Sequence, residues 1–203
     1  MFEFLQKGGV LVIPILLCSV VALAIFVERI IRFSKIKSRG VGLAESTVQL
    51  LNEGKKKEAL QMLAASNAPM GRVLLQAIDV IEQDRDTLET VISNSTDEEV
   101  RDLSSYVQAL ATMGNIAPLL GLLGTVMGMI KAFMVIQQMG GKVNAAVLAG
   151  GIWEAMLTTA LGLAVALPTM VAHSYLLARI DKYEARLQSG AVAFLKGLGK
   201  QKD

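Results

Sequence analysis

Three long apolar runs, separated by stretches rich in charged residues, dominate the pattern of this chain. The first run covers residues 10–27 and contains no charged side chain. The second lies within residues 113–139 and the third within residues 147–177. A helix needs about 20 mostly apolar residues to cross a bilayer, and each run is close to or above that length. The pattern therefore predicts an all-α, polytopic membrane protein with three transmembrane helices.

The first run has a competing interpretation as a cleaved signal peptide. Such a peptide carries a basic region before its apolar run and a small-residue cleavage site after it. Here the run ends in the charged sequence Glu-Arg-Ile-Ile-Arg at residues 28–32, which is typical of a stop-transfer flank. We expect a retained first span over residues 10–33, with Pro14 in its first turn, where proline is tolerated.

The polar stretch between the first two spans, residues 34–112, has largely helical periodicity. Apolar positions within residues 44–66 recur at helical spacing, which predicts one helix or two short helices broken near Gly54. Residues 67–71 contain Pro and Gly and predict a loop. Residues 72–92 then predict another helix, with charges on its outer face.

The next helix is expected to begin near Asn94 or Ser95. Glu98 follows Ser95 by three residues, as in a capping box. The segment from Ser95 to Thr112 contains neither Gly nor Pro. We therefore expect this helix to continue without a break into the second span, as a rod longer than the bilayer is thick.

Lysine and arginine are distributed unevenly around the spans. Five of them lie within residues 29–39, after the first span, and three within residues 179–186, after the third. The opposite side carries Lys7, Lys142 and, at the outer interface, Lys131. The positive-inside rule then places the N-terminus outside and the C-terminus in the cytoplasm.

This topology divides the chain into segments. They are a periplasmic N-terminus (1–9), the first span (10–33), a cytoplasmic helical region (34–112), the second span (113–139), a periplasmic turn (140–146), the third span (147–177) and a cytoplasmic C-terminal helix (178–203).

Composition narrows the function further. The chain is 53% hydrophobic with a formal net charge of +2, which is too small to indicate a nucleic-acid partner. Cys18 is the only cysteine, so no intrachain disulfide can form, and we expect it to be a small buried hydrophobe. His173 has no other metal-binding residue types nearby and is more typical of a polar surface contact. We expect no metal site and no cofactor.

Small residues recur in the second and third spans at intervals of three and four. They are Ala117, Gly121, Gly124, Thr125 and Gly128, with Gly162 in the third span. Small residues let helices approach closely in lipid. The stripe fits either a pore-lining contact between subunits or ordinary packing inside one subunit. A nucleotide-binding loop is excluded, because the glycines lack the following Gly-Lys-Ser/Thr.

Glu154 is an acid inside the third span. Intramembrane acids face protein or water and indicate an ion or proton path by default. Low dielectric disfavours the ionised form of a carboxyl group, so such an acid can bind and release a proton. The alternative is a structural acid paired with a lysine or a backbone donor. No basic residue lies within residues 157–172 to pair with it in the same helix.

Two threonines follow Glu154 closely. At 3.6 residues per turn, Thr158 lies about 40° and Thr159 about 140° around the helix from Glu154. Hydroxyl groups both donate and accept hydrogen bonds, so they can extend a proton path. Periodicity favours Thr158 as the residue on the face of Glu154.

Two sequences carry a resemblance to a known family. Residues 117–133 read APLLGLLGTVMGMIKAF, and residues 151–168 read GIWEAMLTTALGLAVALP. They resemble the MotA/TolQ/ExbB proton channel family, most closely its ExbB/TolQ branch. The resemblance implies that Glu154, Thr125 and Thr159 line a central pore. Thr159 therefore competes with Thr158 as the partner of Glu154, and Thr159 could instead face a neighbouring subunit.

The resemblance also implies an assembly and a function. It implies a homopentamer around a single-span partner similar to ExbD or TolR, linked to a TonB- or TolA-like force-transmitting protein. The expected function is that of a proton-channel subunit in the bacterial inner membrane, not an enzyme, which energises an outer-membrane process. The alternatives are a solute transporter, a passive scaffold and a flagellar stator subunit, which resembles this chain less because it has four spans.

Overall fold

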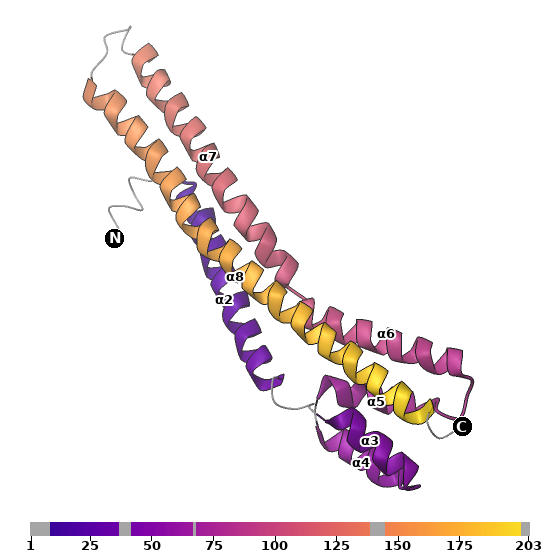
Figure 1. The fold of residues 1–203 in the computed structure, drawn as a ribbon. Helices are drawn as coiled ribbons and strands as arrows, with labels where there is room; N and C mark the ends of the chain where they lie inside the picture. Colours follow the sequence, from indigo (N-terminus) through magenta and orange to yellow (C-terminus); the bar gives the residue numbers. More distant parts are fainter. Residues whose placement is uncertain (1–8, 37–41, 67, 139–144, 200–203) are drawn as a thin grey trace. The chain divides into compact units, whose positions relative to one another are not determined.

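The computed structural model of this chain describes residues 9–36, 42–66, 68–138 and 145–199. Within these ranges the chain is helical, without strands, so the all-α prediction is confirmed. Figure 1 shows the helices, which are α2 (Val12–Ile36), α3 (Leu43–Asn52), α4 (Lys56–Ser66), α5 (Pro69–Asp79), α6 (Arg85–Ser104), α7 (Val107–Gln138) and α8 (Ala145–Gly199).

Three helical stretches are long and apolar enough to cross a membrane. They are Val12–Ile36, Arg85–Gln138 and Leu148–Gly199. They coincide with the three apolar runs of the sequence, which supports a multi-pass membrane protein. The predicted turn at residues 140–146 falls mostly outside the described residues, as do residues 1–8 and 200–203.

The chain forms two compact units. The membrane unit consists of the described residues within 1–28 and 106–175, and the extramembrane unit of those within 29–105 and 176–203. The two long helices α2 and α8 each contribute to both units. The candidate proton site lies entirely in the membrane unit.

The core of the extramembrane unit is built by α3 to α6 and the last part of α8. It buries thirteen residues, which are Ala44, Ala59, Leu63, Met70, Val73, Leu74, Ala77, Ile78, Leu88, Ile92, Leu187, Ala191 and Phe194. Two short helices occupy residues 43–66, with Gly54 between them at a φ of 73°. Of the two alternatives predicted for residues 44–66, the structure therefore shows the two short helices broken near Gly54.

Two helix boundaries in this unit differ from the sequence prediction. The predicted loop over residues 67–71 is wrong from Pro69 onward, because Pro69 occupies the start of α5, where its missing N–H costs nothing. The predicted helix over residues 72–92 is wrong because α5 ends at Asp79. A new helix begins after Asp84, whose carboxylate accepts hydrogen bonds from the Thr87 backbone N–H at 2.9 Å and the Thr87 hydroxyl at 2.7 Å.

Asp84 takes the capping role that the sequence assigned to Asn94 or Ser95. The two hydrogen bonds from Thr87 hold the pKa of the Asp84 carboxyl below its usual value. Ser95 is instead buried inside α6, with its hydroxyl 2.6 Å from the Val91 carbonyl oxygen and 2.5 Å from Gln76 Oε1. A Ser–Glu pair three residues apart therefore does not mark a helix start here.

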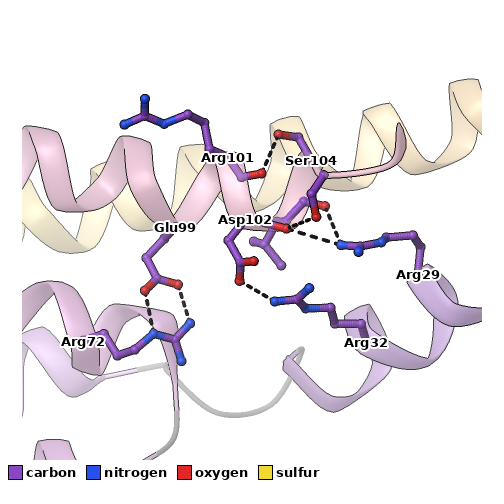
Figure 2. A network of polar contacts seen from close by, with 9 residues as sticks. Arg29, Arg32, Arg72, Glu99, Arg101, Asp102 and Ser104 are labelled. Carbon is purple, nitrogen blue, oxygen red and sulfur yellow. Dashed lines mark hydrogen bonds and ion pairs between the residues drawn. The ribbon is translucent and has the colours of Figure 1, made fainter. Parts of the chain in front are cut away.

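The expected unbroken rod from Ser95 into the second span is also wrong. Helix α6 ends at Ser104, and Tyr106 has a φ of 63°, which a non-glycine residue rarely adopts. Arginines from α2 hold the end of α6 (Figure 2). Arg29 donates from its guanidinium to the carbonyls of Asp102 at 3.3 Å and Leu103 at 3.4 Å, and Arg32 forms an ion pair with the Asp102 carboxylate.

A second ion pair links α5 to α6 in the same unit. The guanidinium of Arg72 faces the carboxylate of Glu99 with two parallel hydrogen bonds, one of them 2.5 Å long (Figure 2). This contact raises the pKa of Arg72 above its usual value. Bidentate pairs of this kind fix geometry more strongly than single contacts do.

Candidate proton site in the membrane unit

The small residues of α7 pack against α8. Helix α7 buries Gly114, Ala117, Gly121, Gly124, Gly128 and Ala132. A Cβ added to Gly121 would lie 3.0 Å from the Thr158 carbonyl oxygen, and one added to Gly128 would lie 3.1 Å from Ala155 Cβ. As the residue number rises along α7, the number of the contacted residue in α8 falls, so the two helices run antiparallel.

The closest approach of an added Cβ to the backbone of the opposite helix is at Gly162. A Cβ there would lie 2.6 Å from the Ala117 carbonyl oxygen and 3.2 Å from Gly121 Cα. Gly124 is equally restricted, because its Cβ would lie 2.2 Å from Thr158 Oγ1. Of the two interpretations of the small-residue stripe, this geometry corresponds to helix packing inside one subunit.

Glu154 lies close to a lysine of the neighbouring helix. Lys131 Nζ in α7 donates to Glu154 Oε1 in α8 at 2.7 Å. The side chain of Glu154 is 25% exposed and that of Lys131 is 53% exposed. The acid therefore has a cationic partner, which is the contact that the structural-acid interpretation requires.

The chain before α2 also approaches Glu154. A Cβ added to Gly9 would lie 2.2 Å from Glu154 Oε1, and Gly9 has a φ of 69°. The positive φ favours glycine, since a side chain would be strained there, whereas Glu154 Oε1 is the far end of a flexible side chain and can shift. The carboxylate thus lies between Lys131 and the backbone of Gly9.

Thr158 and Thr159 both face α7. Thr158 is 1% exposed, and its hydroxyl donates to the Ala155 carbonyl at 2.8 Å and lies 3.5 Å from the Gly121 carbonyl oxygen. The Thr159 hydroxyl donates to the same Gly121 carbonyl at 3.1 Å. Thr158 and Thr159 therefore converge on one backbone oxygen of α7.

Thr125 is bonded within its own helix. Its hydroxyl donates to the Leu122 carbonyl at 2.6 Å, and the residue is half-buried. It lies next to Gly124, which packs against Thr158. Thr158 and Thr159 thus lie in one section of the α7–α8 interface, with Glu154 one helical turn before Thr158, whereas the hydrogen bond of Thr125 stays within α7.

The sequence prediction missed Lys131 as a partner of Glu154, placing it only at the outer interface. The signal lay in the hairpin that α7 and α8 form. Lys131 is about 10 Å from the end of α7 and Glu154 about 14 Å from the start of α8, at 1.5 Å per residue. In an antiparallel hairpin with a short turn, two such positions lie at nearly the same level. Counting residues along each helix from the turn would therefore have identified Lys131 as the partner of Glu154.

No group of three or more His, Cys, Asp or Glu side chains suited to a metal ion occurs among the described residues. His173 is half-buried in α8 and belongs to no such group. The side chains of the candidate site are therefore the carboxylate of Glu154, the ammonium group of Lys131 and the hydroxyls of the three threonines.

Comparisons with known proteins identify the family of this chain. Residues 65–189 match the MotA/TolQ/ExbB proton channel family. The biopolymer transport protein ExbB of Salmonella typhimurium is 30% identical over 194 residues, covering 90% of this chain and 78% of the relative. Biopolymer transport protein exbB1 of Vibrio cholerae is 28% identical over 189 residues, covering 90% and 82%.

A protein from Synechocystis sp. is also similar to this chain. Putative biopolymer transport protein ExbB-like 3 of Synechocystis sp. is 28% identical over 168 residues, which cover 82% of this chain and 80% of the relative. The family match includes α7 and the part of α8 that carries Glu154. The chain therefore belongs to the MotA/TolQ/ExbB proton channel family, a family of transport components rather than of enzymes.

Proposed function

We propose that this chain is the proton-channel subunit of a bacterial inner-membrane complex that uses the protonmotive force to energise an outer-membrane process of the TonB or Tol type. It works as a homo-oligomer, a pentamer, around an ExbD- or TolR-like single-span protein. A TonB- or TolA-like protein transmits the force. Family membership supports this assembly, and the position of Glu154 in a membrane-spanning helix supports the proton role.

The contact between Lys131 and Glu154 carries the proposed mechanism. While Lys131 Nζ lies 2.7 Å from Glu154 Oε1, the ammonium group and the carboxylate form an ion pair. Moving the two groups apart leaves the carboxylate unpaired in a low dielectric, which favours proton uptake. Restoring the contact releases the proton. A relative motion of α7 and α8, or of a partner beside them, is thereby coupled to protonation of Glu154.

The threonines have a supporting role in this proposal. The Gly121 carbonyl oxygen lies within 3.5 Å of both the Thr158 and the Thr159 hydroxyl oxygens. Hydroxyl groups can exchange such bonds for bonds to water, so they can extend a hydrogen-bonded path from Glu154. Thr125 and Thr159 are assigned to this path by the family resemblance, and Thr158 by its position one turn from Glu154.

The protonmotive force supplies enough energy for such a device. A unit charge that crosses the membrane releases about 2.3 kcal/mol per 100 mV. Each proton that crosses the membrane therefore supplies energy that can be coupled to a rearrangement of the α7–α8 interface. A passive scaffold would use none of this energy and would not need Glu154.

The test replaces the titrating group while keeping its shape. Glu154→Gln retains size and most hydrogen bonding, and a neutral amide costs less to bury than an unpaired carboxylate. We expect it to co-purify with the single-span partner yet to lose activity that depends on the protonmotive force in cells. Glu154→Asp, which keeps a carboxyl group one methylene shorter, should retain part of the activity. Full activity of an assembled Glu154→Gln complex would refute the proton role.

A further inference from the structure

The extramembrane unit contains a basic recess apart from the proton site. It has a volume of about 290 Å³ and is lined by Phe33, Arg179, Lys182, Tyr183 and Arg186. Phe33 belongs to α2 and the other four residues to α8. Three cations and two aromatic rings around one hollow form an environment for an anion with an apolar part.

The cations share one face of α8. At about 100° per residue, Arg179, Lys182 and Arg186 lie within about 60° of one another, with Tyr183 on the same face. Asp181 and Glu184 fall on the opposite side of the helix by the same count. The recess is therefore lined by positive charge without an acidic residue of α8 between the cations.

An acidic residue of α6 acts on one lining residue of the recess, Tyr183. The negative charge of Glu99 contributes to the raised pKa of Tyr183. The Glu99 carboxylate, however, already accepts two hydrogen bonds from Arg72. The positive charge of the recess is thus not neutralised by Glu99.

The recess lies where two membrane-spanning helices change from apolar to basic. In α8 the apolar run ends at Leu177, two residues before Arg179. In α2, Phe33 directly follows the charged residue Arg32 at the end of the first apolar run. Basic pockets at this depth meet the headgroups of the bilayer, and anionic lipids are attracted to such positions.

We propose that this recess binds the phosphate-bearing headgroup of an anionic phospholipid, with Arg179, Lys182 and Arg186 as the cationic contacts. The Tyr183 hydroxyl donates to a phosphate oxygen, and the Phe33 ring packs against the apolar part of the lipid. The volume is at the lower end of the range for small-ligand sites and suits a headgroup rather than a whole lipid. This binding is independent of the proton role of Glu154.

The protonation of Tyr183 is consistent with this role. Burial, with a smaller effect of Glu99, raises the pKa of Tyr183 to about 12. The phenol therefore keeps its proton throughout the physiological range and acts as a hydrogen-bond donor to an anion.

The experiment measures binding of short-chain lipids to the purified full-length chain in detergent. The probes are a short-chain phosphatidylglycerol, the corresponding phosphatidylcholine and inorganic phosphate. We expect phosphatidylglycerol to bind at least about tenfold more tightly than phosphatidylcholine, which corresponds to about 1.4 kcal/mol. If inorganic phosphate binds as tightly as phosphatidylglycerol or more tightly, the ligand of the recess is a free anion and the proposal is wrong.

Charge-matched variants locate the site. The double variant Lys182→Gln/Arg186→Gln should lose the preference for phosphatidylglycerol, whereas Lys182→Arg should keep it. The control Arg101→Gln/Lys196→Gln removes the same charge outside the recess and should keep the preference. Equal losses in the recess and control variants would show a general charge attraction and contradict the proposed site. Unchanged helix content by circular dichroism shows that each variant is folded.

Discussion

At the residue scale, the ion pair of Lys131 and Glu154 is the contact on which the proposed chemistry depends. It joins α7 to α8 with one hydrogen bond of 2.7 Å, next to the backbone of Gly9. A relay and a structural pair make different use of this contact. In a relay the pair must open during each cycle, whereas in a structural pair it stays closed.

Substitution of Lys131 distinguishes the two roles. In the proton relay, Lys131→Gln leaves assembly intact and lowers activity, and Lys131→Gln/Glu154→Gln is as inactive as Glu154→Gln alone. In a structural pair, removing either partner destabilises the assembly, and removing both restores much of the lost stability. Co-purification and activity of the single and double variants give the answer. Recovery of assembly and activity in the double variant would contradict the relay.

The glycines of the α7–α8 interface give a second prediction at this scale. Gly162→Ala should destabilise the chain by about 1–3 kcal/mol, because its Cβ would lie 2.6 Å from the Ala117 carbonyl oxygen. Gly150→Ala in the same helix is the matched control, since nothing lies within 4 Å of its added Cβ. It should be neutral or stabilising by up to about 1 kcal/mol. Thermal unfolding in detergent measures both, and equal effects would show that the close approach is absent.

The sequence predicted part of this site. Glu154 and the small residues stand out because an acid and closely spaced glycines are unusual in apolar helices. The partner of Glu154 did not stand out, because Lys131 is 23 residues away and meets it only through the hairpin. Gly9 could not be predicted either. Its contact with Glu154 depends on how the chain before α2 lies against α8.

At the element scale, the boundary between α6 and α7 is the main departure from the expected architecture. No Gly or Pro marks it, and apolar residues at heptad-like spacing continue through it, namely Val100, Leu103, Val107 and Leu110. Tyr106 nevertheless adopts a φ of 63°, while Arg29 donates to the last carbonyls of α6. Tertiary contacts from α2 thus interrupt a segment whose local sequence favours a continuous helix.

Two substitutions of Tyr106 test this boundary, because the structure determines which of the two variants is the more stable. At a left-handed position, Tyr106→Gly should be more stable than Tyr106→Ala by about 1 kcal/mol. In a continuous helix the order reverses, because alanine exceeds glycine in helix propensity by about 1 kcal/mol. Comparing the two variants removes the effect of losing the tyrosine ring. If the alanine variant is the more stable in thermal unfolding, α6 and α7 form one continuous helix and the boundary at Tyr106 is wrong.

Other boundaries were missed because local signals were ambiguous. Asp84 and Ser95 are both good capping residues, and only the buried positions around them decide which one starts α6. Ser95 lies among core residues and contacts Gln76, whereas Asp84 is exposed and free to cap. The break near Gly54 was predictable, since glycine adopts a positive φ without strain.

At the scale of the whole molecule, the membrane unit leaves wide apolar faces without a partner in one chain. Among the exposed apolar side chains are Leu17 and Val20 in α2, Leu122 and Val126 in α7, and Leu163 and Leu167 in α8. Such faces must contact lipid or other subunits. The spans themselves were predictable from the sequence because length and apolarity are enough to identify them. The arrangement of the subunits was not predictable, because an exposed apolar face can contact either lipid or another subunit.

Cysteine crosslinking tests that arrangement. In a chain with Cys18 replaced by serine, single cysteines at Leu122 or Leu163 should form disulfide-linked dimers with high efficiency. A cysteine at Leu17 should not, because we expect the second and third spans to line the central pore and the first span to face lipid. Gel electrophoresis without reductant measures the linked fraction. Efficient links at Leu17, with none at Leu122 and Leu163, would contradict an oligomer whose second and third spans face each other.

The most direct test of the proton role is proton flux through the purified complex. The chain is reconstituted with its single-span partner into liposomes that carry a pH-sensitive dye, and a membrane potential is imposed. We expect Glu154→Gln to lower the flux by about a hundredfold or more, as for loss of a positioned proton-transfer group. The amount of assembled complex per liposome should stay unchanged. Flux equal to that of the unmodified complex would show that protons do not pass through Glu154.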